Sequence, residues 1–298
     1  MTDDRQSRAK HLLRHLRILD APIELPTDVD VEDLVSRRGR GAMLFDFYTP
    51  DAVREALERY GITAKLAERG WAAPVVELET AEADRQIVRV LADRARGGVL
   101  LGEAILRVGP FETDAPFAKG LRGERFPMLF IQWLRLQDPS RRYSRERPAL
   151  PGQDHPGLGV GREVVKMFLG MAERLKLGGI VSCPEFAHNA VLYEAVFRFF
   201  DPAAQGRFEA LMAAATQWTL AELTWGVESG CVIDEATGES VAWSREEMIC
   251  PTSRLLREHL ASADYRGRAD EARRTCRFRF DRERYTALAP LRPDGSPR

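Results

Sequence analysis

The clearest chemical pattern in the chain is a run of alternating glycines, His155-Pro156-Gly157-Leu158-Gly159-Val160-Gly161-Arg162. It precedes an amphipathic segment at 162–176 that predicts a helix. Glycine lacks a Cβ atom, so a ligand can approach its backbone closely. The free N–H groups and the dipole of a helix's first turn favour an anion. The segment therefore predicts a loop that binds a phosphate group through its backbone.

Two common phosphate-binding patterns do not fit this loop. A dinucleotide-binding loop needs GxGxxG directly after a strand and an acidic residue about twenty residues later. Here the spacing is GxGxG, and the residues before it form a polar stretch with several prolines. A P-loop needs GxxxxGK followed by Ser or Thr, and the chain has no such sequence.

The elements around the loop follow a definite order. Residues 127–137 are the most apolar run and predict a central strand buried on both faces. After the glycine loop and its helix come a short strand at 180–183 and a second helix at 187–200. Upstream, strands are expected at 74–78 and 99–108, a strand or helical turn at 84–92, and short helices on either side of Gly61.

This order, over about residues 74–201, resembles the GNAT superfamily of acyl-CoA-dependent N-acetyltransferases. The family's loop reads Gln/Arg-x-x-Gly-x-Gly/Ala. Gly159 and Gly161 match its two small positions, and Pro156 stands at the Gln/Arg position. Tyr193 matches the tyrosine of the family's Leu-Tyr-Glu helix. The family often has an asparagine seven residues before that tyrosine, where this chain has Phe186, and the nearest asparagine is Asn189.

The resemblance implies an α/β fold, with a mixed, mainly antiparallel central sheet flanked by helices and helical extensions at both ends. It also implies an acyltransferase (transferase) that uses acetyl-CoA or another acyl-CoA and acts on a small-molecule or protein amine by direct transfer from the thioester. A backbone N–H in the central strand would polarise the thioester carbonyl, and Tyr193 would protonate the leaving thiolate. The implied cofactor-binding residues are Gln132, Trp133, Leu134, Gly157, Leu158, Gly159, Val160, Gly161, Arg162 and Asn189.

The general base has two candidates. Glu103 lies in the strand expected at 99–108, where apolar neighbours would raise the pKa of its carboxyl, or it is a solvent-facing strand residue. His155 precedes the glycine loop and titrates near neutral pH, or it is a solvated surface histidine. Tyr193 likewise has a structural alternative, as a core tyrosine of an amphipathic helix.

Composition limits the classes of function. Among 298 residues, 44 Lys and Arg balance 45 Asp and Glu, which argues against nucleic acid as the main partner. No apolar run is long enough for a membrane span, and the first twenty residues have no secretory signal. The four cysteines and five histidines show no CxxC or HExxH, so no metal site is predicted. We expect a cytoplasmic protein.

We divide the chain into an N-terminal helical extension (1–70, beginning with a helix at 1–20), an acyl-CoA-binding core (71–205), a helical and hairpin extension (206–289) and a disordered tail (290–298). Two alternatives remain open: a catalytically inactive CoA-binding or scaffold protein, and a nucleic-acid-binding regulator that uses the helix pair at 51–71. The sequence does not give the acceptor, the acyl length or the oligomeric state.

Overall fold

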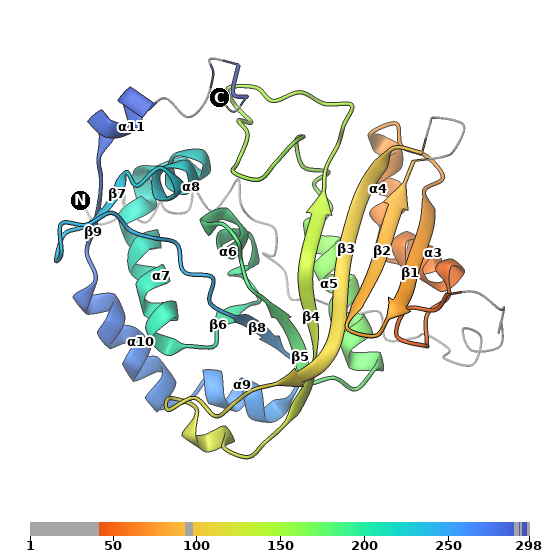
Figure 1. Ribbon diagram of the computed structural model, residues 1–298, viewed down its shortest axis with the longest axis horizontal. Coiled ribbons are helices and arrows are strands. Elements are labelled where there is room, and N and C mark those ends of the chain that lie inside the picture. Colours follow the sequence, from red (N-terminus) through yellow and green to blue (C-terminus); the bar gives the residue numbers. More distant parts are fainter. Residues whose placement is uncertain (1–41, 93–97, 289–291, 293, 297–298) are drawn as a thin grey trace.

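A computed structural model describes residues 42–92, 98–288, 292 and 294–296, so the helix expected at 1–20 lies outside the described residues. A seven-stranded sheet of order β1-β2-β3-β4-β5-β8-β6 is flanked by helices (Figure 1). This confirms the α/β class with a mixed, mainly antiparallel sheet. The strands are β1 (Val75–Glu82), β2 (Arg85–Leu91), β3 (Leu100–Phe111), β4 (Phe126–Leu136), β5 (Gly179–Ser182), β6 (Arg198–Phe199) and β8 (Met248–Pro251).

Strands β4 and β5 form the one parallel pair among the described strands. Their pairing ends where Ile131 faces Ser182, although β4 continues to Leu136. Figure 1 shows the two strands diverging beyond this point. The register of β4 against β3 also shifts here, because Ile131 and Trp133 face consecutive residues of β3 and Gln132 is left as a bulge.

The expectation that β4 is buried on both faces is wrong for its second half. Met128 and Leu129 are fully buried, but Gln132 is exposed and the Trp133 side chain is 39% exposed. The reason is that β5 is short, so no strand pairs with this edge of β4 beyond Ile131, and only the glycine loop meets it, at Leu136. The apolar composition of the segment does not show where its neighbour ends.

Three helices cover one face of β2, β3 and β4: α3 (Pro50–Arg59), α4 (Ile62–Glu68) and α5 (Gly161–Arg174). The α3 helix begins at Pro50, with the Thr49 side chain accepting a hydrogen bond from the Ala52 N–H at 3.2 Å. Gly61 joins α3 to α4 with a φ of 75°, a left-handed conformation that favours glycine. Val53, Leu57 and Leu66 are buried against the sheet.

The C-terminal part supplies further helices, a short second sheet and one strand of the central sheet. Strand β8 lies in the segment that we assigned to an extension, yet it pairs with both β5 and β6. The sequence also predicts a helix at 206–227, which is divided at residues 215–219, and a hairpin at 231–243. The hairpin forms: the Asp234 N–H donates to the Glu239 carbonyl at 2.9 Å and the Val241 N–H to the Val232 carbonyl at 2.8 Å, and β7 in addition pairs with β9. The remaining elements are η2 (Lys119–Leu121), α6 (Ala187–Tyr193), α7 (Pro202–Ala214), η3 (Ala215–Gln217), α8 (Leu220–Glu228), β7 (Val232–Asp234), α9 (Arg254–Leu260), α10 (Ala263–Thr275), β9 (Phe278–Phe280) and α11 (Arg282–Leu288).

Candidate functional site

The glycine loop is anchored to the end of β4. The Asp138 N–H donates to the Pro156 carbonyl at 2.7 Å, and the Leu158 N–H donates to the Leu136 carbonyl at 3.2 Å. The Leu158 and Val160 side chains are 2% and 1% exposed, whereas the glycines at 157 and 159 are exposed. Alternation along the loop therefore buries its side chains and leaves glycine backbone at the surface.

Helix α5 begins at Gly161, directly after this loop. Its N-cap residue is Val160, whose side chain cannot accept a hydrogen bond, and no side chain caps the helix. The first N–H groups of an α-helix have no partners within the helix. Those of Gly161, Arg162 and Glu163 are therefore available to an anion at the position where the sequence predicts one.

A buried carboxylate below the loop was not anticipated from the sequence. Asp138 follows β4 and is 0% exposed. Its Oδ1 accepts hydrogen bonds from Trp71 Nε1 at 3.0 Å and from the Ser140 hydroxyl at 2.6 Å. Its Oδ2 lies 3.6 Å from Arg69 Nη1 and 3.4 Å from Arg141 Nε. Burial opposes ionisation, but the hydrogen bonds from Ser140 and Trp71 outweigh it and lower the pKa of the Asp138 carboxyl.

Arg69 brings a positive charge to the glycine loop. Its guanidinium lies so close to Gly159 that a Cβ atom at that position would be 2.8 Å from Nη2. Gly159 also has a φ of 68°. Arg69 ends the helical pair and lies far from the loop in sequence, so no local motif could have identified it.

The predicted carbonyl-binding residues lie at the bulge of β4. Gln132 and Trp133 are exposed next to the unpaired edge of β4, whereas Leu134 faces the apolar interior beneath α5. A bulge leaves one residue without a partner in the ladder and turns the strand locally. The structure thus places a bulged residue with backbone polar groups where β4 and β5 separate.

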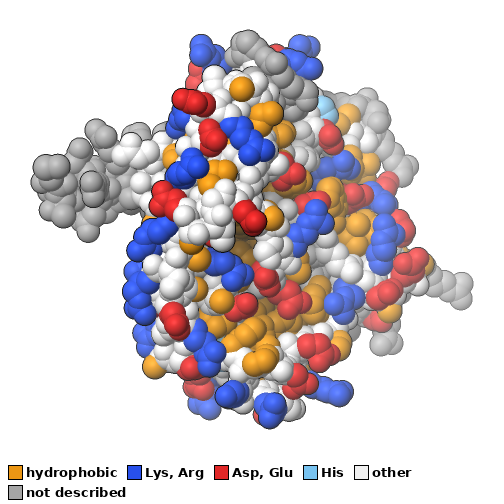
Figure 2. Space-filling view, turned by 60° about the vertical axis from the view of Figure 1, so that its left-hand side comes forward, with side chains coloured by type: hydrophobic (Ala, Val, Ile, Leu, Met, Phe, Trp, Pro, Cys, Tyr) orange, Lys and Arg blue, Asp and Glu red, His pale blue; other side chains and the backbone are white. Residues whose placement is uncertain are grey.

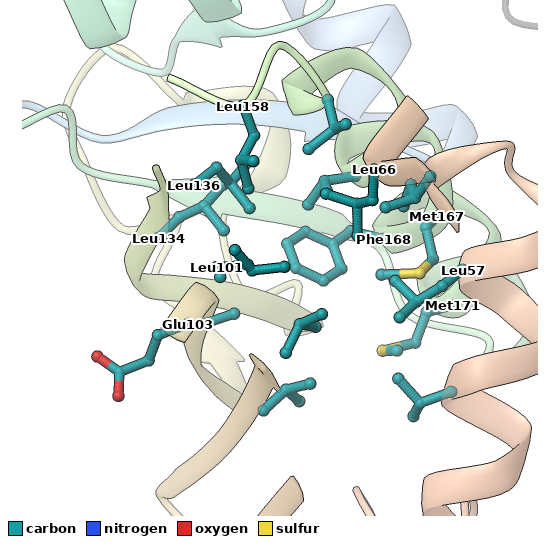
Figure 3. A pocket seen from close by; sticks show the side chains of 18 of the residues that line it. Leu57, Leu66, Leu101, Glu103, Leu134, Leu136, Leu158, Met167, Phe168 and Met171 are labelled. Carbon is teal, nitrogen blue, oxygen red and sulfur yellow. The ribbon is translucent and has the colours of Figure 1, made fainter. Parts of the chain in front are cut away.

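The surroundings of Glu103 differ from those expected. Its carboxylate lies 2.9 Å from Arg89 Nε and 3.9 Å from Arg135 Nη2, rather than among apolar groups. Both arginines face Glu103 directly on the neighbouring strands. Figure 3 shows the carboxylate pointing away from the apolar side chains beneath it. Strand register, which single-strand periodicity does not reveal, decides this environment.

His155 and Asn189 have local partners. His155 is exposed, and its backbone N–H donates to the Gln137 side chain at 3.2 Å. The Asn189 Oδ1 accepts from the Phe186 N–H at 3.1 Å and so closes the first turn of α6. Asn189 therefore helps to fix the start of α6, next to the end of β5.

Tyr193 is the last residue of α6, on the opposite side of the β4–β5 opening from β4 (Figure 1). It is half-buried, with its ring 5.3 Å from that of Phe197. Burial raises the pKa of Tyr193 to about 12, so its hydroxyl stays protonated at neutral pH.

His188 fixes α6 to α8 and was not selected as a site residue. It is buried, and its Nδ1 lies 3.2 Å from the Thr224 hydroxyl. Its ring stacks on Phe186 at 5.6 Å. Desolvation lowers the pKa of His188 to about 4, so the imidazole is neutral at pH 7. These contacts indicate a positioning role for the helix that carries Tyr193.

An apolar cavity of about 50 Å³ lies between the sheet and the three helices (Figure 3). Its walls include Leu134 of β4 and both buried side chains of the glycine loop, Leu158 and Val160. The structure therefore brings the predicted carbonyl-binding segment and the predicted phosphate loop to the same cavity.

Within the described ranges, no helix is long and apolar enough to cross a membrane. The same residues contain no group of three or more His, Cys, Asp or Glu side chains that could hold a metal ion. Comparisons with family models, curated proteins and solved structures found no match to this chain. The function is therefore argued from the geometry of the site.

Proposed function

We propose that this chain is an acyl-CoA-dependent N-acyltransferase with a GNAT-like core. One observation carries the proposal: the parallel pair β4–β5 separates beyond Ile131 and Ser182, and the strands are connected by an exposed glycine loop and an uncapped helix. This arrangement leaves residues 132–135 of β4 without a β5 partner, as a place for a thioester arm, with an anion site at the loop that follows β4.

The anion site consists of backbone N–H groups. The first turn of α5 presents free donors, and exposed Gly157 and Gly159 leave space for a pyrophosphate beside them. Arg69 adds a cation next to Gly159. The family's loop has Gln or Arg where this chain has Pro156, and Arg69 supplies a positive charge there from a different part of the chain.

The chemistry expected of the protein is mostly positioning. Backbone N–H groups around the Gln132 bulge stabilise negative charge that develops on a carbonyl oxygen. The Tyr193 hydroxyl, protonated at neutral pH, donates its proton to the leaving sulfur. Glu103 and His155 remain the candidate bases for the attacking amine. The acceptor is a small-molecule or protein amine.

Contacts in the helix pair favour this proposal over a nucleic-acid-binding regulator. Lys65 Nζ lies 2.8 Å from Glu163 Oε1, and Arg69 pairs with Asp138. Lys65 is thus paired within the protein, and Arg69 is held between Asp138 and the glycine loop, so neither forms part of a basic helix face. The helices bury their apolar side chains against the sheet. On the face turned forward in Figure 2, which lies away from the helix pair, acidic and basic side chains are also intermixed.

The test is calorimetric binding of CoA and acetyl-CoA to the wild-type chain and to Gly161→Val. No atom lies within 4 Å of a Cβ placed at Gly161, so the variant folds but fills the space in front of the helix. Gly267→Val in α10, which also adds a side chain to open space, is the matched control.

We expect micromolar binding by the wild-type chain and the control, and at least tenfold weaker binding by Gly161→Val. No binding of either ligand by the wild-type chain refutes the proposal. Binding without acyl transfer to a panel of primary amines favours the catalytically inactive CoA-binding protein instead.

A further inference from the structure

The apolar cavity beneath the glycine loop lies next to the proposed reaction site. The side chains that surround it come from α3, α4, α5, three strands and the loop, with Phe168 near its centre (Figure 3). Glu103 is the charged residue in its wall, and the carboxylate points outward toward Arg89. The interior is therefore apolar, and such cavities stay dry rather than hold water.

Leu134 belongs both to the cavity wall and to the proposed carbonyl-binding segment of β4. It belongs to the strand segment expected to polarise the thioester carbonyl, and its side chain forms part of the cavity wall together with that of Leu158. A chain that extends from the acyl carbonyl at this segment would meet the cavity within one side-chain length. The bulge at Gln132 turns β4 at this point.

We propose that this cavity receives the aliphatic chain of an acyl group longer than acetyl, so that the acyl donor is a short- to medium-chain acyl-CoA. The inference rests on the proposed function. The cavity of about 50 Å³ has room for about two methylene-sized groups, because a cavity of about 150 Å³ takes the six carbons of a benzene. The first carbons of a hexanoyl chain span the distance from the carbonyl-binding segment, and its last two carbons match this space.

The experiment compares binding of CoA, acetyl-CoA and hexanoyl-CoA to the wild-type chain by calorimetry. Burial of two methylenes strengthens binding by up to about 14-fold, and we expect hexanoyl-CoA to bind about tenfold more tightly than acetyl-CoA. Equal binding of acetyl-CoA and hexanoyl-CoA overturns this inference and leaves the proposed function standing. Absence of binding for all three ligands overturns both.

A variant that fills the cavity tests whether the preference for hexanoyl-CoA arises there. Ala104 lies in β3 on the cavity wall, and Ala104→Val adds two methyl groups of a strand-favouring side chain. Ala81→Val, at an exposed position of β1, is the matched control. We expect Ala104→Val to remove the preference for hexanoyl-CoA, keep acetyl-CoA affinity within twofold and leave the melting temperature unchanged or higher.

An unchanged hexanoyl preference in Ala104→Val overturns the assignment of the chain to this cavity. If Ala104→Val lowers the melting temperature, Val164→Ile, which adds one methyl group from the α5 side of the cavity, replaces it with the same expected loss of preference.

Discussion

The buried carboxylate of Asp138 should contribute strongly to stability because it joins the end of the helix pair to the segment that follows β4. It holds the indole of Trp71, the Ser140 turn and the guanidinium of Arg69 below the glycine loop. Asp138→Asn keeps an oxygen that can accept from Trp71 and Ser140 but removes the charge that faces the two arginines. Asp138→Ala removes the charge and the accepting oxygens.

The expected losses follow from the contacts. A hydrogen bond or close contact to a charged group contributes about 1.5–3 kcal/mol, and Arg69 and Arg141, at 19% and 48% side-chain exposure, can partly turn to water. We therefore expect Asp138→Asn to lower the free energy of unfolding by about 2 kcal/mol. Asp138→Ala also loses bonds to Trp71 and Ser140 at about 1 kcal/mol each, so we expect about 4 kcal/mol.

Thermal unfolding followed by circular dichroism measures the stability loss of both variants. At about 2–4 °C per kcal/mol, Asp138→Asn lowers the melting temperature by about 4–8 °C and Asp138→Ala by about twice that. Asp154→Asn is the control, since Asp154 is 72% exposed and 3.7 Å from Arg135 and contributes little. A melting temperature of Asp138→Asn equal to that of the control would refute the reasoning that the buried charge stabilises the fold.

The pH dependence of stability supplies a second measurement on the same residue. Because the folded pKa of Asp138 lies below its unfolded value, the stabilisation is present above about pH 4 and is lost as the pH falls through the folded pKa. Asp138→Asn should therefore lose less stability than the wild-type chain on acidification below pH 4. Parallel losses in both proteins would contradict this assignment.

Three further outcomes follow from the structure. Because the pKa of His188 is lowered to about 4, its burial as a neutral ring contributes about 3 kcal/mol of stability above pH 6.5, which is lost as the pH falls to 4. His188→Gln should therefore weaken the dependence of the melting temperature on pH between 6.5 and 4. The same pH dependence in the variant and the wild-type chain would contradict this assignment. Gly159→Ala should lower the free energy of unfolding, measured in urea, by about 1–2 kcal/mol, because Gly159 has a φ of 68° and its Cβ would meet Arg69. Gly157→Ala should lower it much less, because its Cβ would lie 3.8 Å from the Leu136 carbonyl oxygen, an ordinary contact. Tyr193→Phe should lower kcat at least tenfold with CoA affinity unchanged, and an unchanged kcat would exclude Tyr193 as the acid.

Local signals account for the parts of the fold that the sequence predicted correctly. Thr49 and Pro50 start α3, Gly61 separates two helices, and the glycine run leads into α5, because capping and left-handed turns depend on a few adjacent residues.

Burial and partners were harder to predict, because they depend on residues distant in the chain. The exposed half of β4 follows from the early end of β5, and the charge around Glu103 follows from the register that places Arg89 and Arg135 beside it. Strand β8 enters the sheet as four residues, too short to show a period.

The sequence by itself determined the starts of α3, α5 and α6, the glycine loop and the α/β class, since these depend on backbone propensity and local hydrophobic pattern. Only the tertiary structure decided that Arg69 lies against Gly159, that Asp138 is buried beneath them, and that Leu134 and Leu158 border one cavity. The physical reason is that long-range packing fixes which side chains lose water and which charges meet. No local spacing encodes those contacts.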